Sequence, residues 1–387
     1  MSEALTGAGV VVQQLAAALD GDAIAGADGS GYGPQISFGR EDGWSRAGVT
    51  PLLEYGLLKV HGADAASFLQ SQLTSDVAGL GAGEVRLAGY CSVKGRLTAS
   101  FWIWRDEAQQ AFWLACSRDV AAAIAKRLSM FVLRAKAMVE DVSDTMALVG
   151  TISVADDPLD ASLAGPVRLP TVGVSASVAA ALAPAGSAGA APWAQAPRPA
   201  PLADLRIDRT MRPMAASALA PALERMRADG ATLLATTAWR RLEVLSGVAR
   251  INAGNQDLFV PQMVNFELVD GVNFKKGCYP GQEIVARSQY LGKLKRRMFL
   301  GLGHGPVPLP GADVGAGEQA AEPVGQVVMA APLADGERFV VLFESRTVAV
   351  PEAGEAPVDT GLRVGASPLW RLPLPYALPA GDRPDVR

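Results

Sequence analysis

Residues 273–297 read NFKKGCYPGQEIVARSQYLGKLKRR, and the rest of the chain can be interpreted outward from this stretch. A Pro-Gly pair precedes an amphipathic run, which predicts a loop over residues 275–281 and a helix starting near Pro280 or Gly281. Glu283 then lies in the first helical turn, where an anion is favoured, and Arg287 follows it by four positions. Gly292 suits the helix end. The helix has one mostly apolar face, formed by Ile284, Val285, Ser288 and Leu291.

Cys278 lies just ahead of the predicted helix N-terminus, within reach of Lys275 and Lys276. The helix dipole and the ammonium groups both favour the thiolate. The same residues are also typical of a surface turn that holds a half-buried cysteine beside a solvated basic cluster. The stretch therefore has two interpretations, a reactive thiol or an ordinary turn.

The length and composition of the chain exclude several classes of protein. A chain of 387 residues predicts two or three domains. Its 49% apolar and 19% charged residues, with a net charge of −4, argue against general nucleic-acid binding. No apolar run is long enough to cross a membrane, and the N-terminus lacks the features of a secretory signal. We therefore expect a cytoplasmic monomer without direct nucleic-acid or membrane binding.

Cysteine and histidine are scarce. Cys91, Cys116 and Cys278 contain no Cys-x-x-Cys pair, which fits a reducing cytoplasm better than a disulfide framework. His61 and His304 are the two histidines. Such a set lacks the ligand clusters of a structural zinc or iron–sulfur site, and neither histidine is near a nucleophile elbow. We expect no tightly bound metal, and hydrolytic mechanisms are disfavoured.

The periodicity of the chain divides it into an arm and three domains. Residues 1–45 are rich in Gly, Ala and Asp and form the predicted flexible N-terminal arm, which contains a short helix over residues 10–19. Residues 46–145 alternate between strand and helix patterns in the order of a ferredoxin-like unit, with helices on one sheet face and the other face free. The expected strands are 54–60, 84–91, 96–105, 111–116 and 135–142, with helices from Asp64 and over 118–131.

A second ferredoxin-like unit is expected over residues 146–291, interrupted by an Ala/Pro/Gly-rich insertion at about 155–203 whose middle is expected to be flexible. Residues 292–387 are rich in strand patterns and predict an antiparallel β-barrel. The fold class is therefore α+β, two ferredoxin-like domains plus a barrel. The cysteine loop would lie at a domain junction, where ligand sites concentrate.

Residues 276–283, KGCYPGQE, resemble the signature Lys-Gly-Cys-Tyr-x-Gly-Gln-Glu of the YgfZ family of folate-binding proteins, which is related to the glycine cleavage T-protein. Further segments are similar to the family: residues 62–64 with 68–77, the hairpin turn 91–96, and Val260-Pro261-Gln262 with Asn265. The resemblance spans about residues 52–375. It implies a cloverleaf of three domains around a central tetrahydrofolate hole.

The resemblance further implies a role in iron–sulfur cluster assembly or repair, including that of radical enzymes that modify tRNA. Iron–sulfur proteins or assembly factors would be the partners, and the motif cysteine, Cys278, would be functionally important. One departure concerns the folate tail. Glu243 stands where many members have arginine, and Gly247-Val248-Ala249 replaces Gly-Ile-Pro, so Arg240 or Arg241 would have to supply the charge.

Reduced folate requires polar contacts for its pterin and cations for its glutamate tail. The residues expected to provide them are Gln70, Asp76, Lys94, Arg96, Gln262, Asn265, Lys276, Tyr279, Gln282, Glu283 and Arg287. For Cys278, three roles stay open: nucleophile, redox sensor or transient ligand of a cluster delivered by a partner. The alternative functions are a T-protein-type aminomethyltransferase and a binding module in which the thiol is inert.

Overall fold

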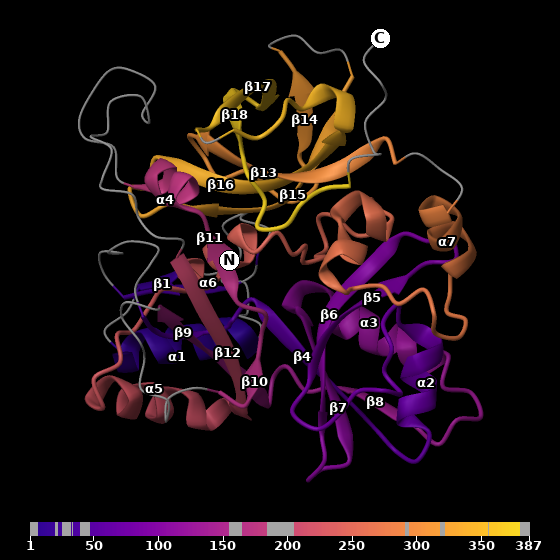
Figure 1. Ribbon diagram of the computed structural model, residues 1–387. Helices are drawn as coiled ribbons and strands as arrows, with labels where there is room; N and C mark the ends of the chain where they lie inside the picture. Colours follow the sequence, from indigo (N-terminus) through magenta and orange to yellow (C-terminus); the bar gives the residue numbers. More distant parts are fainter. Residues whose placement is uncertain are drawn as a thin grey trace, which may run out of the picture.

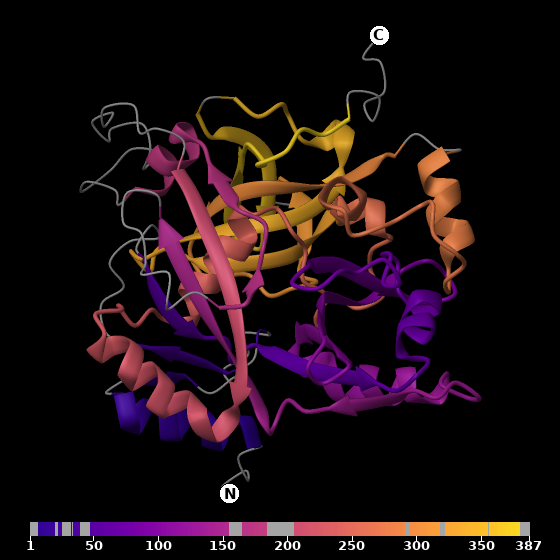
Figure 2. The ribbon, with the colours of Figure 1, turned by 60° about the horizontal axis from the view of Figure 1, so that its bottom comes forward.

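The computed structural model describes residues 7–19, 22–24, 32, 34–38, 47–154, 165–183, 205–290, 294–317, 322–354 and 356–379. Two sheet-and-helix units lie side by side, and a barrel lies across both of them in the two views of Figures 1 and 2. This arrangement confirms the predicted α+β class with a C-terminal antiparallel barrel.

The first sheet has the strand order β5-β6-β7-β4-β8 and carries two helices on one face. Because side chains alternate along a strand, Leu58 of β4 packs under the helices, whereas its neighbour Leu57 faces the centre of the molecule. One face is thus left open to the other domains, as the pattern predicts. The elements are β4 Tyr55–His61, α2 Ala65–Gln72, β5 Val85–Cys91, β6 Leu97–Asp106, β7 Ala111–Ser117, α3 Arg118–Met130 and β8 Met138–Asp141.

The second sheet has the order β10-β12-β9-β3, with β11 also paired to β12. Helix α5 packs on one face through Leu223, and α6 packs on the other, where Trp239 covers Gly150. Strand β3 joins this sheet although it falls in the range predicted for the first unit. The elements are β3 Gly48–Pro51, β9 Met146–Val154, β10 Val167–Arg168, β11 Val172–Val174, α4 Ala176–Leu182, β12 Leu205–Ala215, η3 Ala216–Ala218, α5 Leu219–Ala228 and α6 Thr236–Leu245.

Two segments expected to be flexible contribute to the second domain. In the N-terminal segment, α1 (Gly7–Leu19) buries Leu15 and Leu19 against α5, and β1 (Asp22–Ile24) pairs with β2 (Gln35–Ser37). Within the predicted insertion, residues 165–183 form β10, β11 and α4 on the sheet. The sequence predicts the helix, over residues 10–19, but not the strands or α4, because an average over a Gly- and Ala-rich composition does not reveal their few apolar residues.

The C-terminal domain is a closed barrel with the order β13-β16-β15-β14-β17-β18. Closure leaves none of these strands as a free sheet edge. Phe299, Val327 and Phe343 lie in one of its cores. The elements are β13 Arg296–His304, β14 Asp313–Ala316, β15 Gly325–Pro332, β16 Arg338–Arg346, η6 Thr347–Ala349, β17 Val358–Val364 and β18 Ser367–Leu372.

The segment between α6 and the barrel returns to the first sheet, although the sequence assigns it to the second unit. Leu97 N donates to Phe259 O at 2.8 Å, and Asn273 N donates to Thr74 O at 2.9 Å. The segment contains η4 Pro261–Val264, η5 Phe266–Val269 and α7 Gln282–Tyr290. The cysteine loop therefore lies beside the first domain (Figure 1). The predicted helix end at Gly292 lies outside the described residues.

Candidate functional site

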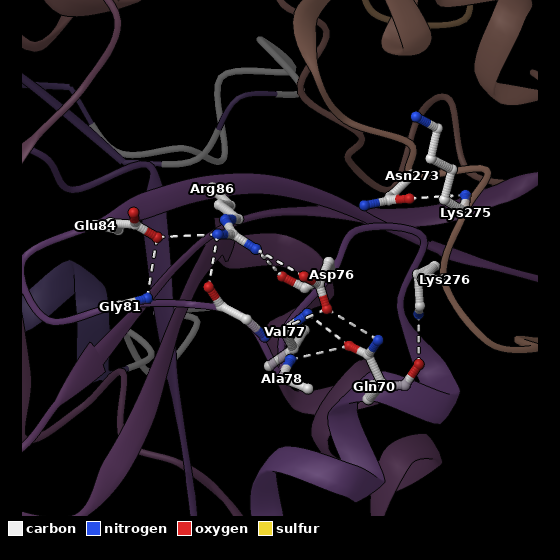
Figure 3. A network of polar contacts seen from close by, with 11 residues as sticks. Gln70, Asp76, Val77, Ala78, Gly81, Glu84, Arg86, Asn273, Lys275 and Lys276 are labelled. Carbon is white, nitrogen blue, oxygen red and sulfur yellow. Dashed lines mark hydrogen bonds and ion pairs between the residues drawn. The ribbon is translucent and has the colours of Figure 1, made fainter.

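Lys276 fixes the cysteine loop, residues 275–281, to the end of α2. Its Nζ donates to the carbonyl oxygen of Gln70 (Figure 3) and to that of Leu73, at the C-terminal end of that helix, where a cation is favoured. The same ammonium lies 5.2 Å from the centre of the Tyr279 ring. Partial burial lowers the pKa of Lys276 to about 8, and nearby Asp76 opposes this effect. Lys276 thus positions the loop rather than simply adding a solvated charge.

Cys278 is exposed, whereas Cys91 and Cys116 are buried. It precedes α7, which begins at Gln282. The neighbouring Tyr279 is buried, and its burial raises the pKa of its phenol. The thiol is therefore exposed to solvent between Lys276, which is bound to α2, and the buried Tyr279. This geometry removes the interpretation of a half-buried cysteine, and it is compatible with nucleophile, redox or transient-ligand chemistry.

Gly281 brings the loop onto the hairpin turn between β5 and β6. Its φ is +76°, and a Cβ there would lie 2.6 Å from Gly95 Cα. Gly95 has φ +67°, and a Cβ on it would lie 2.8 Å from Ile284 Cβ. Two glycines are thus required where the loop, the hairpin turn and α7 meet.

Gln70 and Asp76 hold a turn after α2. Gln70 Nε2 donates to Asp76 Oδ1 at 3.0 Å, and Gln70 Oε1 accepts from Val77 N at 2.6 Å. Arg86 bridges Asp76 and Glu84, with Nη2 2.9 Å from Glu84 Oε2 (Figure 3). Slight burial acts to raise the pKa of Asp76, but hydrogen bonds and Arg86 lower it overall. These side chains support the α2 end to which Lys276 is bound.

The other expected ligands also make contacts within the protein. Gln262 is buried and donates from Nε2 to Val285 O at 2.7 Å. Asn265, at φ +58°, donates to Met298 O at 2.9 Å and joins the segment to β13. Arg96 donates to Leu258 O, whereas Lys94 is exposed in the turn.

On α7, Gln282 is half-buried, and Glu283 and Arg287 form the expected i,i+4 pair at 3.9 Å on the exposed face. Of the predicted apolar face, Val285 is buried and Ile284 is 37% exposed, while Leu291 lies outside the described residues.

A second cluster of charged side chains lies at the centre of the molecule, and of its members the sequence pointed only to Glu243 and Arg240. Arg250 Nη2 lies 2.5 Å from Glu54 Oε2 and 3.4 Å from Glu243 Oε2, and Arg240 Nη1 lies 3.1 Å from Glu54 Oε1. Tyr55 donates to Glu243 Oε1. Burial raises the pKa of Glu54, although Arg240 and Arg250 oppose it. We call these groups, together with Arg209, the central ionic cluster.

The central ionic cluster contains three guanidinium groups and two carboxylates. Arg209 on β12 is 2% exposed, and its Nε has no hydrogen-bond partner among the described residues. Its guanidinium lies 5.5 Å from the Trp239 ring. Burial lowers the pKa of Arg209, since it disfavours the cation. The excess positive charge and the unsatisfied donor make this a site suited to an anionic or acceptor-rich group.

The cluster borders a cavity at the open face of the first sheet, whose other walls include Leu87, Phe101 and Trp102. None of the expected folate contacts lines it. Its volume is about 10 Å³, room for about one water molecule. The residues therefore suit the polar edge and anionic tail of a folate, but their side chains would have to move to admit one.

The cavity and the cysteine loop lie at different positions along one hairpin. Trp102 lines the cavity, whereas Gly95, seven residues earlier, touches the loop. Seven residues of extended strand span roughly 23 Å. Arg209 and Arg250 carry little signal in the sequence, although the alternation of apolar and charged residues in 205–212 places Arg209 on the inward face of a strand.

Two negative findings apply to the part of the chain that the structure describes. No group of three His, Cys, Asp or Glu side chains is placed to hold a metal ion. No helix there is long and apolar enough to cross a membrane.

Comparison with known proteins gives a consistent set of relatives. The chain is 32% identical over 336 residues to the tRNA-modifying protein YgfZ of Edwardsiella ictaluri, covering 83% of this chain and 89% of that protein. It is 29% identical to the protein of the same name from Sodalis glossinidius, covering 84% of this chain and 92% of that one. No family model matches the chain.

A solved structure shares the fold. The glycine cleavage system aminomethyltransferase T from Bartonella henselae superimposes with a TM-score of 0.61 and 15% identity, covering 94% of this chain and 96% of that one.

Proposed function

Because this chain belongs to the YgfZ family, we propose that it is a tetrahydrofolate-binding accessory protein for iron–sulfur cluster assembly or repair, with Cys278 as its working thiol. Its clients would be iron–sulfur proteins, including radical enzymes that modify tRNA. The relatives' names, "tRNA-modifying protein YgfZ", support a role connected with tRNA modification. The proposal includes a cytoplasmic location and a monomeric chain.

The observation that carries the proposal is the exposed Cys278 in a loop fixed at both ends, by Lys276 on α2 and by Gly281 on Gly95. A fixed and accessible thiol suits attack on, or transient ligation of, a group that a partner presents. One thiol cannot hold a cluster alone. A client protein would therefore have to supply the remaining ligands.

The central ionic cluster is the proposed folate site. The pterin of a reduced folate has an amide-like edge that a carboxylate such as Glu243 can bind, and its glutamate tail is anionic. Arg209 and Arg250 offer buried cations for that tail, and Trp102 offers an apolar wall. Bound there, reduced folate would supply a one-carbon carrier or a reductant.

Calorimetric titration with tetrahydrofolate tests the ligand. We expect binding by wild type and by Cys278→Ala, and weaker binding by Arg209→Met, which removes the buried cation. Arg168→Met is the matched control because Arg168 is exposed on the same sheet. Equal binding by Arg209→Met and wild type would remove the central cluster from the ligand site.

Activity in cells tests the thiol. Replacing the chromosomal copy by Cys278→Ala is expected to lower the activity of iron–sulfur enzymes that modify tRNA, while the thermal unfolding of the purified variant stays at the wild-type value. Undiminished enzyme activity in that strain would exclude Cys278 from the mechanism. One-carbon transfer to tetrahydrofolate by the purified protein would instead favour an aminomethyltransferase.

A further inference from the structure

Four large apolar side chains are exposed together where α3 ends and the chain turns toward β8. Met130, Phe131, Leu133 and Met138 are 61%, 47%, 86% and 53% exposed. Isolated exposed apolar residues are common on proteins, but a group of this kind within nine residues indicates an interaction site. We call these residues, with Lys126, Arg134 and Lys136, the α3–β8 patch.

Leu133 is unfavourable to the folded chain in two respects. It is almost fully exposed, and its φ is +43°, in the left-handed region that a bulky side chain rarely adopts. The turn around it is nevertheless held by backbone hydrogen bonds, with Val132 N donating to Ser129 O at 3.3 Å and Ala135 N donating to Val132 O at 2.8 Å. Backbone strain of this kind concentrates at functional sites.

The charge of the patch is opposite to that of the whole chain. Lys126, one helical turn before Met130, and Arg134 and Lys136, between Leu133 and Met138, are all exposed, in a protein whose net charge is −4. Electrostatic complementarity therefore selects an acidic partner. Methionine and leucine dominate the apolar part, as at adaptable protein-binding surfaces, whereas sites for single-stranded nucleic acid use aromatic rings on which bases stack.

Helix α2 connects the patch to the cysteine loop. At its start, Asp64 Oδ2 accepts from Lys136 N at 2.7 Å, and Asp64 N donates to Lys136 O at 3.1 Å. At its end, the carbonyls of Gln70 and Leu73 accept from Lys276. Eight helical residues span about 12 Å, so a protein seated on the patch is within one helix length of the Cys278 loop.

We propose that the α3–β8 patch is the docking surface for a partner protein with an acidic face and apolar side chains at its centre, and that docking there brings the partner to Cys278. The surface itself does not depend on which ligand occupies the central cavity.

The test uses a fluorescein-labelled helical peptide with leucines at i, i+3, i+4 and i+7 and glutamate on its other faces, titrated with the full chain and followed by fluorescence anisotropy. Leu133→Asn keeps a residue that tolerates the left-handed conformation but removes the apolar side chain. We expect this variant to bind the peptide at least about five-fold more weakly, because one apolar side chain is no longer buried in the complex. Its melting temperature should be no lower than that of wild type.

A control variant and a test of the charges complete the design. Val348→Asn removes an apolar side chain that is 66% exposed on the barrel and should bind as wild type does. Arg134→Glu with Lys136→Glu should weaken binding, and added salt should do the same to wild type.

The proposal is overturned if wild type does not bind the acidic peptide, or if Leu133→Asn binds it as tightly as wild type. Displacement of the peptide by transfer RNA would assign the patch to nucleic acid and would also overturn it. Tetrahydrofolate titration of Leu133→Asn should match wild type, which keeps failure of the docking surface distinct from failure of the folate proposal.

Discussion

Gly281 of the cysteine loop and Gly95 of the β5–β6 turn pack backbone against backbone, although 186 residues separate them in the sequence. Both have positive φ, and neither has room for a side chain. The position of Cys278 therefore depends on a contact with the first domain, not on the loop alone. In the hairpin turn, Gly95 forms this contact, whereas the sequence drew attention to the basic residues Lys94 and Arg96 as ligand contacts.

Gly281→Ala is expected to destabilise the protein by about 1–3 kcal/mol. The alanine would have to adopt a left-handed backbone conformation, and its Cβ would lie only 2.6 Å from Gly95 Cα. The free energy of unfolding in urea measures the loss. Gly277→Ala, in the same loop, is the matched control, since among the described residues only its own chain neighbours lie within 4 Å of its Cβ position. Equal stability of the two variants would mean that the glycine contact does not position the loop.

Thiol alkylation of the folded protein is expected to modify Cys278 and leave the other two cysteines intact. Cys91 and Cys116 are buried, and burial, with a smaller contribution from Asp257, raises the pKa of Cys91 to about 12. Burial likewise raises the pKa of Cys116. Mass spectrometry after brief iodoacetamide treatment locates the label. If Cys278→Ser were labelled to the same extent as wild type, or if wild type were labelled only slowly, the alternative of an inert thiol would be supported.

Much of the fold follows from local pattern. Alternating apolar residues in the first sheet predict strands close to those observed, and Val120, Ile124 and Leu128 predict the buried face of α3. In the barrel, strands are expected at 298–303, 324–331 and 338–350, which match β13, β15 and β16, whereas β14, β17 and β18 are not predicted. The packing of residues 165–183 could not be predicted because their few apolar residues are diluted by a Gly- and Ala-rich surrounding. The return of residues 250–290 to the first sheet depends on tertiary hydrogen bonds that no local pattern encodes.

The site shows a similar division. The motif located Cys278 and Lys276, and the structure adds that Lys276 binds α2. Gln262 and Asn265 were expected to contact the ligand. The sequence alone does not distinguish a polar residue that binds a ligand from one that holds the fold, because the side chains are the same. Most of the central ionic cluster was missed, because only Arg240 and Glu243 stood out in the sequence. Arg209 and Arg250 acquire their meaning only when separate elements bring them to Glu54 and Glu243.

Glu54→Ala is expected to cost about 3–5 kcal/mol of the free energy of unfolding, because it leaves Arg240 and Arg250 buried without their shared carboxylate. Urea unfolding measures the loss. Asp144→Ala is the comparison, because Asp144 pairs with Arg118 at 2.8 Å on the surface, where a salt bridge contributes about 0–1 kcal/mol. Similar losses in the two variants would contradict a desolvated cluster at the domain junction.

The pKa of Lys276 predicts a pH dependence of stability that a lysine-to-methionine change should remove. Partial burial lowers this pKa to about 8 from its usual 10.5, so between these values the unfolded chain binds more protons than the folded chain. The contribution of Lys276 to the free energy of unfolding must then rise as the pH increases from 8 to 10.5, and it must be constant below pH 8.

Urea unfolding of wild type and Lys276→Met at pH 7 and pH 9.5 measures this contribution as the difference between the two proteins. A larger difference in favour of wild type at pH 9.5 is expected, since the neutral amine still donates to Gln70 O and Leu73 O without the cost of burying a charge. A difference that is the same at both pH values, or smaller at pH 9.5, would show that the ammonium is solvated and that Lys276 does not fix the cysteine loop to α2.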